Sequence, residues 1–300
     1  MTISYDNSNV TLKNTAIGTA AVVAGWEGQT YLSKAAKYPF QKYLGSKIPS
    51  IRGGGFLPYV NTALKQNNLE NKIKIVDLNQ NNAITVSNRL GIKLKSDNII
   101  TKIINHILRL PSKENSFLRT VNGCNAFFYP KKNAVVCNFD KFGAPIFHEL
   151  QHKLNSTSSN ILVKALVKLK HPLAIFGTMG ISACSLLTNE TKDGEKENFA
   201  QKIKNNCGLL ALGCMLPHTI EEFIANIKGT DIAKKAGVTG EMLKKVKSAH
   251  KISMISYGAV ALITAFSVWG GNKIRDIICR QKIDKNSIQN TKSKQPNYIA

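Results

Sequence analysis

The sequence predicts an α+β fold that is predominantly helical, with a small β-sheet and about two to four membrane-associated or transmembrane helices. Long stretches without charge lie in the second half of the chain, and a bilayer core of about 30 Å needs about 20 such residues. Residues 72–96 alternate between apolar and polar side chains, which is typical of short strands. Residues 96–110 repeat apolar side chains with helical spacing, which predicts an amphipathic helix.

The first part of the chain is expected to form an N-terminal segment, 1–30, and a small α+β region, 31–118. Within the segment, "TAIGTAAVVAGW" from Thr15 to Trp26 is rich in small residues and predicts an amphipathic or membrane-apposed helix. Two or three short strands are expected within 72–96. The helix that follows should end before Pro111, because proline disfavours helical geometry in the residue before it.

Three apolar helices are expected after residue 170. The strongest transmembrane candidate is 251–272, in which Ile252 to Asn272 contains no charged residue. The stretch 172–189 is shorter. The third stretch is long enough to cross only as a helix over 199–220 whose lysines extend to the interface. Residues 273–300 are predicted to be a basic mobile tail. For all these helices the alternative is the core of a soluble protein.

The charge balance is strongly basic, with 41 Lys and Arg against 18 Asp and Glu and a net charge of +23. The lysines are spread along the chain, without the dense runs or zinc-finger spacing typical of specific nucleic-acid binding. Attraction to anionic lipid accounts for the charge equally well. The six cysteines form no C-x-x-C pair and are expected to be reduced packing residues.

The stretch "GAPIFHELQHKLN", residues 143–155, contains the pattern H-E-x-x-H. On a helix, His148 and His152 lie on one face one turn apart, the separation that a single zinc ion requires. Glu149 lies beside them, close enough to act on a water molecule. The alternative is a helix that happens to expose two histidines, so a third ligand is needed.

A third ligand is expected about seventy residues later, on a helix beginning at Pro217. Glu222 is the preferred ligand. Glu221 competes with it but points about 100° away on a helix, and an acidic residue near a helix N-terminus is the favoured interpretation. His218 is a candidate donor to an oxyanion, although a role at the helix start is favoured. His106 and His250 are expected to be structural or exposed to solvent.

Three motifs now stand in a recognisable order. "NAFFYPKKNAVVCN" from Asn125 to Asn138 precedes H-E-x-x-H, and Glu222-Phe223-Ile224-Ala225-Asn226 follows the apolar helices. In this order the chain resembles the integral-membrane gluzincin endopeptidases, which include the HtpX-type heat-shock proteases and the CAAX prenyl-protein proteases. The resemblance covers roughly residues 120–240 and implies a zincin-like metallopeptidase core over 119–250.

The resemblance implies one Zn²⁺ per chain, held by His148, His152 and Glu222 with water in the fourth position. Glu149 would be the catalytic general base. The substrate would pair with the strand before the motif helix as an exposed edge. The residues assigned to this binding strand are Asn125, Ala126, Ala134, Val135 and Val136.

Two features depart from the family pattern. Asn226 stands where the family has an aspartate that accepts a hydrogen bond from a ligand histidine; as a neutral acceptor it would hold zinc less tightly. The connection from Asn125 to His148 is also short. Both departures are compatible with a relative that keeps the fold without the activity.

The sequence therefore predicts a membrane-associated zinc metalloendopeptidase that hydrolyses peptide bonds in membrane or membrane-proximal proteins. The main alternative is a catalytically inactive membrane scaffold or binding protein with the same fold. A basic nucleic-acid-binding protein is a third reading, although no specific nucleic acid is expected. Because the basic body of the chain, 34–170, should stay inside, the active site is expected to face the cytoplasm from the cell membrane.

Overall fold

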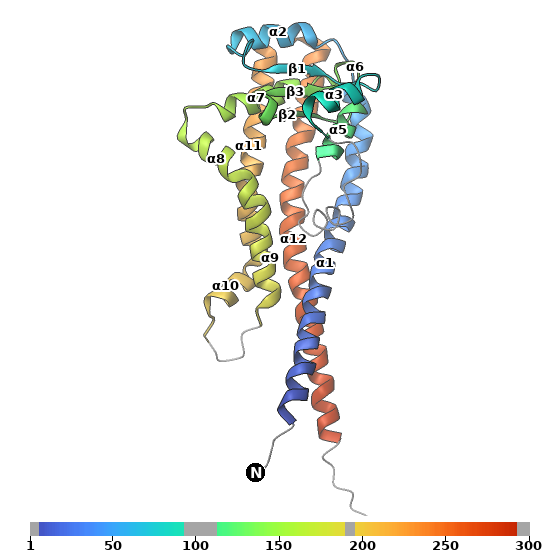
Figure 1. Ribbon diagram of the computed structural model, residues 1–300, viewed down its shortest axis with the longest axis vertical. Helices are drawn as coiled ribbons and strands as arrows, with labels where there is room; N and C mark the ends of the chain where they lie inside the picture. Colours follow the sequence, from blue (N-terminus) through green and yellow to red (C-terminus); the bar gives the residue numbers. More distant parts are fainter. Residues whose placement is uncertain (1–5, 93–112, 190–195, 293–300) are drawn as a thin grey trace, which may run out of the picture. The chain divides into compact units, whose positions relative to one another are not determined.

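The computed structural model describes residues 6–92, 113–189 and 196–292 (Figure 1). It is mostly helical and contains one three-stranded sheet. The chain divides into two compact units. We call residues 39–176 and 214–261 the sheet unit, and residues 1–38, 177–213 and 262–300 the helical unit.

The helices and strands follow one another in this order: α1 (Asp6–Ile51), α2 (Leu57–Gln66), β1 (Lys74–Asp77), α3 (Ala83–Leu90), α5 (Lys113–Val121), β2 (Ala126–Tyr129), a 3₁₀ turn (Pro130–Lys132), β3 (Ala134–Cys137), α6 (Phe139–Phe142), α7 (Ile146–Ser156), α8 (Ile161–Pro172), a π-helical turn (Leu173–Gly177), α9 (Thr178–Leu187), α10 (Phe199–Asn205), α11 (Cys207–Lys235) and α12 (Gly240–Lys292).

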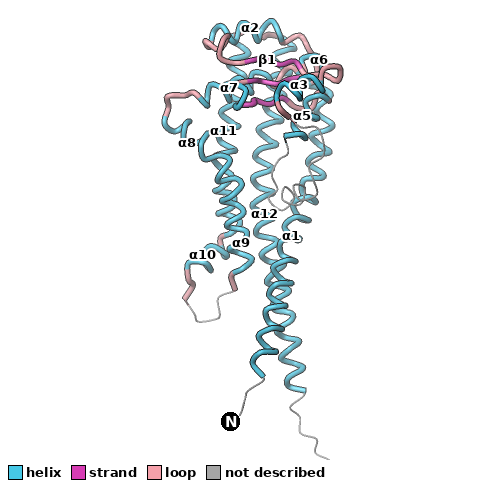
Figure 2. Tube along the Cα trace, viewed as in Figure 1, coloured by secondary structure: helices cyan, strands magenta, loops and turns pink. Residues whose placement is uncertain are grey.

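The sheet, whose strands are magenta in Figure 2, has the order β1-β3-β2, with β3 parallel to β1 and antiparallel to β2. All four residues of β3 are buried. Because successive side chains of a strand point to opposite faces, Val135 and Cys137 join one core cluster, while Ala134 and Val136 join the other. The first cluster also includes residues of α2, α7, α11 and α12, and the second includes residues of α3 and α5. Thus β3 is the central strand of a sheet covered on both faces.

The region 72–92 holds one strand rather than two or three. After β1, residues 83–90 form α3. Val86 and Leu90, four residues apart, are both buried in the second core cluster, as one face of a helix requires. The helix ends at Gly91, whose φ of 68° suits glycine. The helix predicted over 96–110, together with His106, lies outside the described residues.

The prediction that a helix begins at Pro217 is wrong. This residue lies inside α11, which runs without a break from Cys207 to Lys235. Proline removes one backbone donor, four residues after Gly213, and this helix accommodates the loss. The break occurs earlier, at Asn206 between α10 and α11, so 199–220 is not one helix.

Among the residues that the structure describes, two helices are long and apolar enough to cross a membrane, namely Cys207–Lys235 and Gly240–Arg280. The second contains the stretch 252–272 that the sequence singled out. The stretch 172–189 is helical up to Leu187, with a π-helical turn at Leu173–Gly177 before α9.

Residues 273–292, predicted to belong to a mobile tail, continue α12. In the helical unit, Asp276 accepts hydrogen bonds from Lys204 at 2.5 Å and from Arg275 at 3.0 Å. All three side chains are buried. This ion cluster holds the helix beyond the apolar stretch.

Candidate metal centre

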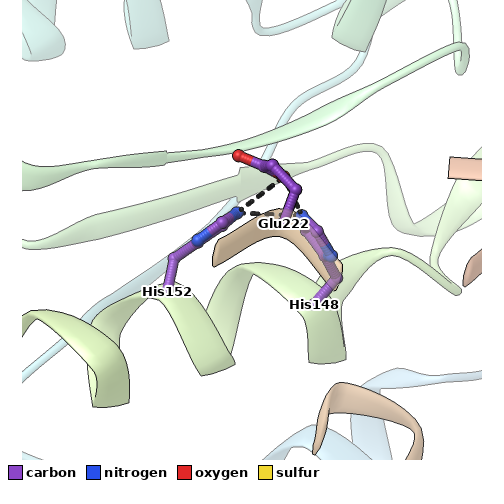
Figure 3. Close-up of side chains that lie close together, drawn as sticks. All are labelled: His148, His152 and Glu222. Carbon is purple, nitrogen blue, oxygen red and sulfur yellow. Dashed lines mark hydrogen bonds and ion pairs between the residues drawn. The ribbon is translucent and has the colours of Figure 1, made fainter. Parts of the chain in front are cut away.

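The two histidines are placed by α7, which packs against the sheet. Ile146, Phe147 and Leu150 are buried in the first core cluster, and the ring of Phe147 meets that of Phe56 edge-on, with centroids 6.2 Å apart. His148 and His152 project from the same side of this helix one turn apart (Figure 3). The apolar side chains of α7 therefore fix the direction in which the imidazoles point.

Glu222 comes from α11, which approaches α7 closely at Gly229. A Cβ atom at position 229 would lie 2.9 Å from the carbonyl oxygen of Phe147 and 3.0 Å from Cα of His148. Such backbone contact is available only to glycine. Glu222 lies seven residues earlier, two turns along the same face of α11, and so reaches the histidine pair.

The side chains of His148, His152 and Glu222 converge, and one ligand atom from each lies within 4.8 Å of the others. Oε2 of Glu222 is 3.2 Å from Nε2 of His148 and 3.4 Å from Nε2 of His152. The two Nε2 atoms are 2.9 Å apart (Figure 3). The side chains of His148 and Glu222 are buried, and that of His152 is 11% exposed. The group could hold a metal ion.

The chemistry of these donors suits a cation. Oε2 of Glu222 is buried and has no hydrogen-bond partner among the described residues. Burial alone would lower the pKa of His152, but the Glu222 and Glu221 carboxylates outweigh it and raise this pKa to about 10. Without a metal, a proton on His152 supplies positive charge; a divalent ion would replace it, because metal ligands must be deprotonated.

Glu149 lies between the histidines and the sheet. Its Oε2 accepts a hydrogen bond from the backbone N–H of Phe128 at 2.7 Å, and its Oε1 is 4.0 Å from Nε2 of His148. Burial raises the pKa of this carboxyl, against the opposing effect of the two histidines. The structure therefore brings the expected general base, the histidine pair and β2 together.

The strand expected to bind substrate needs correction. Ala134, Val135 and Val136 belong to β3, which pairs with β1 on one side and β2 on the other. Their backbone groups cannot accept a further strand. The sheet edge nearest Glu149 is β2, which begins at Ala126, directly after Asn125. Isolated sequence motifs could not distinguish these strands, because the pairing order depends on the distant strand β1.

Glu221, which was not the preferred metal ligand, lies against one of the two histidines. Its side chain is 1% exposed, and its Oε1 lies 2.9 Å from Nδ1 of His152. The same oxygen accepts a hydrogen bond from Asn155 at 2.9 Å, and Oε2 accepts one from Lys170 at 2.7 Å. Since α11 begins fourteen residues earlier, Glu221 is not an acidic residue at a helix N-terminus. Only its position next to Glu222 could have hinted at this role.

Asn226 does not make the expected hydrogen bond to a histidine. Its amide nitrogen donates to the carbonyl of Glu222 at 2.8 Å and to Ser253 at 3.2 Å. Two buried atoms lack a hydrogen-bond partner among the described residues, namely Oδ1 of Asn226 and Nδ1 of His148.

His250 is buried rather than exposed; its Nδ1 lies 2.7 Å from the hydroxyl of Thr230.

His218 lies on the same side of α11 as Glu222, one turn earlier. Its Nδ1 is 3.8 Å from Oε1 of Glu222, and its ring centroid is 5.3 Å from that of Tyr257 on α12. The ring centroid of His171 is 5.9 Å from that of His218. Tyr257 therefore faces this polar cluster.

The described part of the chain thus brings together the three predicted ligands, the predicted base and His218, the candidate oxyanion donor. It separates the predicted binding strand into an edge and a central strand. It also adds Glu221, Lys170 and Asn155 to the surroundings of His152. No protein-family model, curated protein or solved structure matches the chain.

Proposed function

We propose that this protein is a membrane-associated, zinc-dependent endopeptidase with a zincin-like core. The observation that supports this most directly is the convergence of His148, His152 and Glu222, with Glu149 on the side facing the sheet. The same order of motifs in the gluzincin endopeptidases, to which the sequence is similar, supports the reaction class.

Zinc is the metal that we assign to the site. Two imidazole nitrogens and one carboxylate oxygen are ligands that zinc commonly takes, and three protein ligands leave a position open, as in catalytic sites. When bound, zinc supplies a Lewis acid that polarises a carbonyl group and makes water a better nucleophile at neutral pH.

Within this proposal Glu149 accepts the proton of the attacking water and returns it to the departing amine. Its raised pKa suits a group that must take up a proton and then release it. His218 would donate a hydrogen bond to the oxygen of the former carbonyl as negative charge develops there. Both groups lie close to the ligand side chains, at 4.0 Å from His148 and 3.8 Å from Glu222 respectively.

The substrate that we propose is an extended peptide segment. It would lie along the outer edge of β2, where main-chain hydrogen bonds hold a peptide regardless of its side chains. The backbone N–H of Phe128 already donates to Glu149, so this hydrogen bond places the general base at the edge of β2 rather than offering a free donor. Pairing at this edge would bring a peptide bond next to the metal ligands.

The two candidate membrane helices favour membrane-embedded or membrane-proximal proteins as substrates. Following the positive-inside rule, we place the basic body of the chain, 34–170, on the cytoplasmic side of the cell membrane. The chain should therefore remain with membranes after an alkaline carbonate wash and require detergent for extraction. Release by the wash alone would contradict this placement.

The decisive test of the activity compares wild type with Glu149→Gln, purified in detergent and loaded with zinc. The probe is a fluorescently labelled casein, which offers many extended segments. We expect wild type to cleave it and Glu149→Gln to be slower by at least about 10²-fold, because the general base is lost. Zinc content should be equal in both.

The alternative is a zinc-binding or metal-free scaffold that retains the fold, and Asn226 in place of an aspartate is the observation that favours it. If wild type holds zinc but cleaves neither casein nor membrane proteins, the scaffold is the better account. If Glu149→Gln cleaves as fast as wild type, the cleavage comes from a contaminant, and the enzyme proposal fails.

A further inference from the structure

We propose that Glu221 is the positioning residue that orients His152 toward the metal. It would supply a carboxylate behind one ligand histidine, a support that Asn226 does not give to the other. The inference rests on the metal centre of the proposed function, but it concerns a residue that the motif pattern does not include.

The geometry gives His152 two different neighbours. Its Nδ1 lies 2.9 Å from Oε1 of Glu221, and its Nε2 faces Oε2 of Glu222 at 3.4 Å. If Nδ1 carries the proton and donates it to Glu221, Nε2 is left with its lone pair directed at the ligand cluster. A carboxylate behind a ligand histidine fixes the tautomer and the ring orientation, and it makes the other nitrogen a stronger ligand.

Glu221 is itself held firmly. A buried carboxylate is costly unless it is paired and hydrogen-bonded, and both oxygens of Glu221 have partners. Oε1 lies against His152 and accepts a hydrogen bond from Asn155 on α7. Oε2 accepts a hydrogen bond from Lys170 on α8 at 2.7 Å. Three helices, α7, α8 and α11, therefore meet at this one side chain.

Lys170 balances the charge of the two adjacent glutamates. Its Nζ is 2.7 Å from Glu221 but 3.8 Å from the nearer oxygen of Glu222. The lysine therefore pairs with the positioning carboxylate and leaves Oε2 of Glu222 facing the imidazoles. This division explains how two neighbouring glutamates can be buried together while only one faces the ligand cluster.

The second histidine has no such support. Nδ1 of His148 is buried and has no hydrogen-bond partner among the described residues, and Asn226 directs its amide elsewhere. The two ligand histidines are thus held unequally. Removing Glu221 should therefore loosen the better-held ligand.

The test measures the zinc dissociation constant of the full chain in detergent by competition with a chromogenic chelator. Glu221→Gln keeps the size of the side chain but removes its charge. We expect it to weaken zinc binding about 10- to 100-fold. Asp231→Asn is the matched control, because it removes the same charge from an exposed position on the same helix; its affinity should stay within twofold of wild type.

A spectroscopic measurement separates positioning from general loss of structure. With Co²⁺ in place of zinc, the visible absorption bands should shift in Glu221→Gln, because His152 is free to rotate, and stay unchanged in Asp231→Asn. Lys170→Met should produce a smaller change in the same direction. If Glu221→Gln does not fold, Lys170→Met alone decides the matter through affinity and spectrum.

An unchanged affinity and cobalt spectrum in Glu221→Gln would overturn the inference while leaving the metal centre intact. If wild type itself bound no zinc, the proposed function would fail instead, so the two failures are distinguishable.

Discussion

At the scale of single residues, two adjacent glutamates on α11 have different surroundings. Glu222 faces both imidazoles, while Glu221 touches the far nitrogen of His152. Helical geometry predicts this divergence, since neighbouring side chains differ in direction by about 100°. It does not predict what the second side chain meets, because Lys170 and Asn155 come from other helices.

His218 offers a residue-scale prediction. If it stabilises an oxyanion, His218→Ala should lower the rate of casein cleavage about 10²- to 10³-fold. Zinc content should not change, because His218 lies outside the ligand group. The comparison is His171→Ala, which removes a ring whose centroid lies 5.9 Å from that of His218 and which should have little effect. Loss of zinc in His218→Ala, or an unchanged rate, would refute this role.

At the scale of helices and strands, the close approach of α7 and α11 determines whether the ligands meet. Gly229→Ala would place a Cβ 2.9 Å from the backbone oxygen of Phe147. Overpacking of this kind commonly costs about 1–3 kcal/mol. We expect both a lower unfolding temperature and at least tenfold weaker zinc binding, because separating the helices moves Glu222 away from His148.

Gly213→Ala is the matched control on the same helix, since its added Cβ would meet nothing within 4 Å. Alanine is favoured over glycine inside helices by about 1 kcal/mol, so this variant should be as stable as wild type or more so. If both variants bind zinc like wild type, contact at Gly229 does not set the ligand geometry.

The sequence predicted those elements whose signal is local. The helix with the histidine pair, the strand over 134–137 and the apolar stretch inside α12 all agree with the structure. Residues 83–90 were predicted to belong to a strand because apolar and polar side chains alternate there, but the alternating stretch is short. In the structure Val86 and Leu90 are buried together on one face of a helix. The central position of β3 could not be predicted, because it depends on pairing with β1, about sixty residues away.

At the scale of the whole molecule, the helical unit depends on buried charges. Asp276 is the acidic partner of both Lys204 and Arg275. Arg275 also donates to the carbonyl of Leu186 and to Asn189. The polar composition of residues 273–300 predicts a mobile tail and gives no sign of this arrangement.

Asp276→Asn should therefore strongly destabilise the helical unit. Removing one partner of a buried ion pair typically costs about 3–5 kcal/mol, because the remaining charges stay buried without compensation. Thermal unfolding in detergent measures the effect, and Asp231→Asn, at an exposed pair with Lys234, should change the unfolding temperature little. Equal unfolding temperatures for the two variants would show that the cluster contributes no stability.

The central claim is that His148, His152 and Glu222 form a zinc site, and zinc content per chain tests it most directly. Detergent-purified wild type, His148→Ala, Glu222→Gln and Glu149→Gln should be prepared at neutral pH with ample zinc. The account predicts about one zinc per chain in wild type and Glu149→Gln, and little in the two ligand variants. No zinc in wild type, or equal zinc in all four proteins, would contradict it.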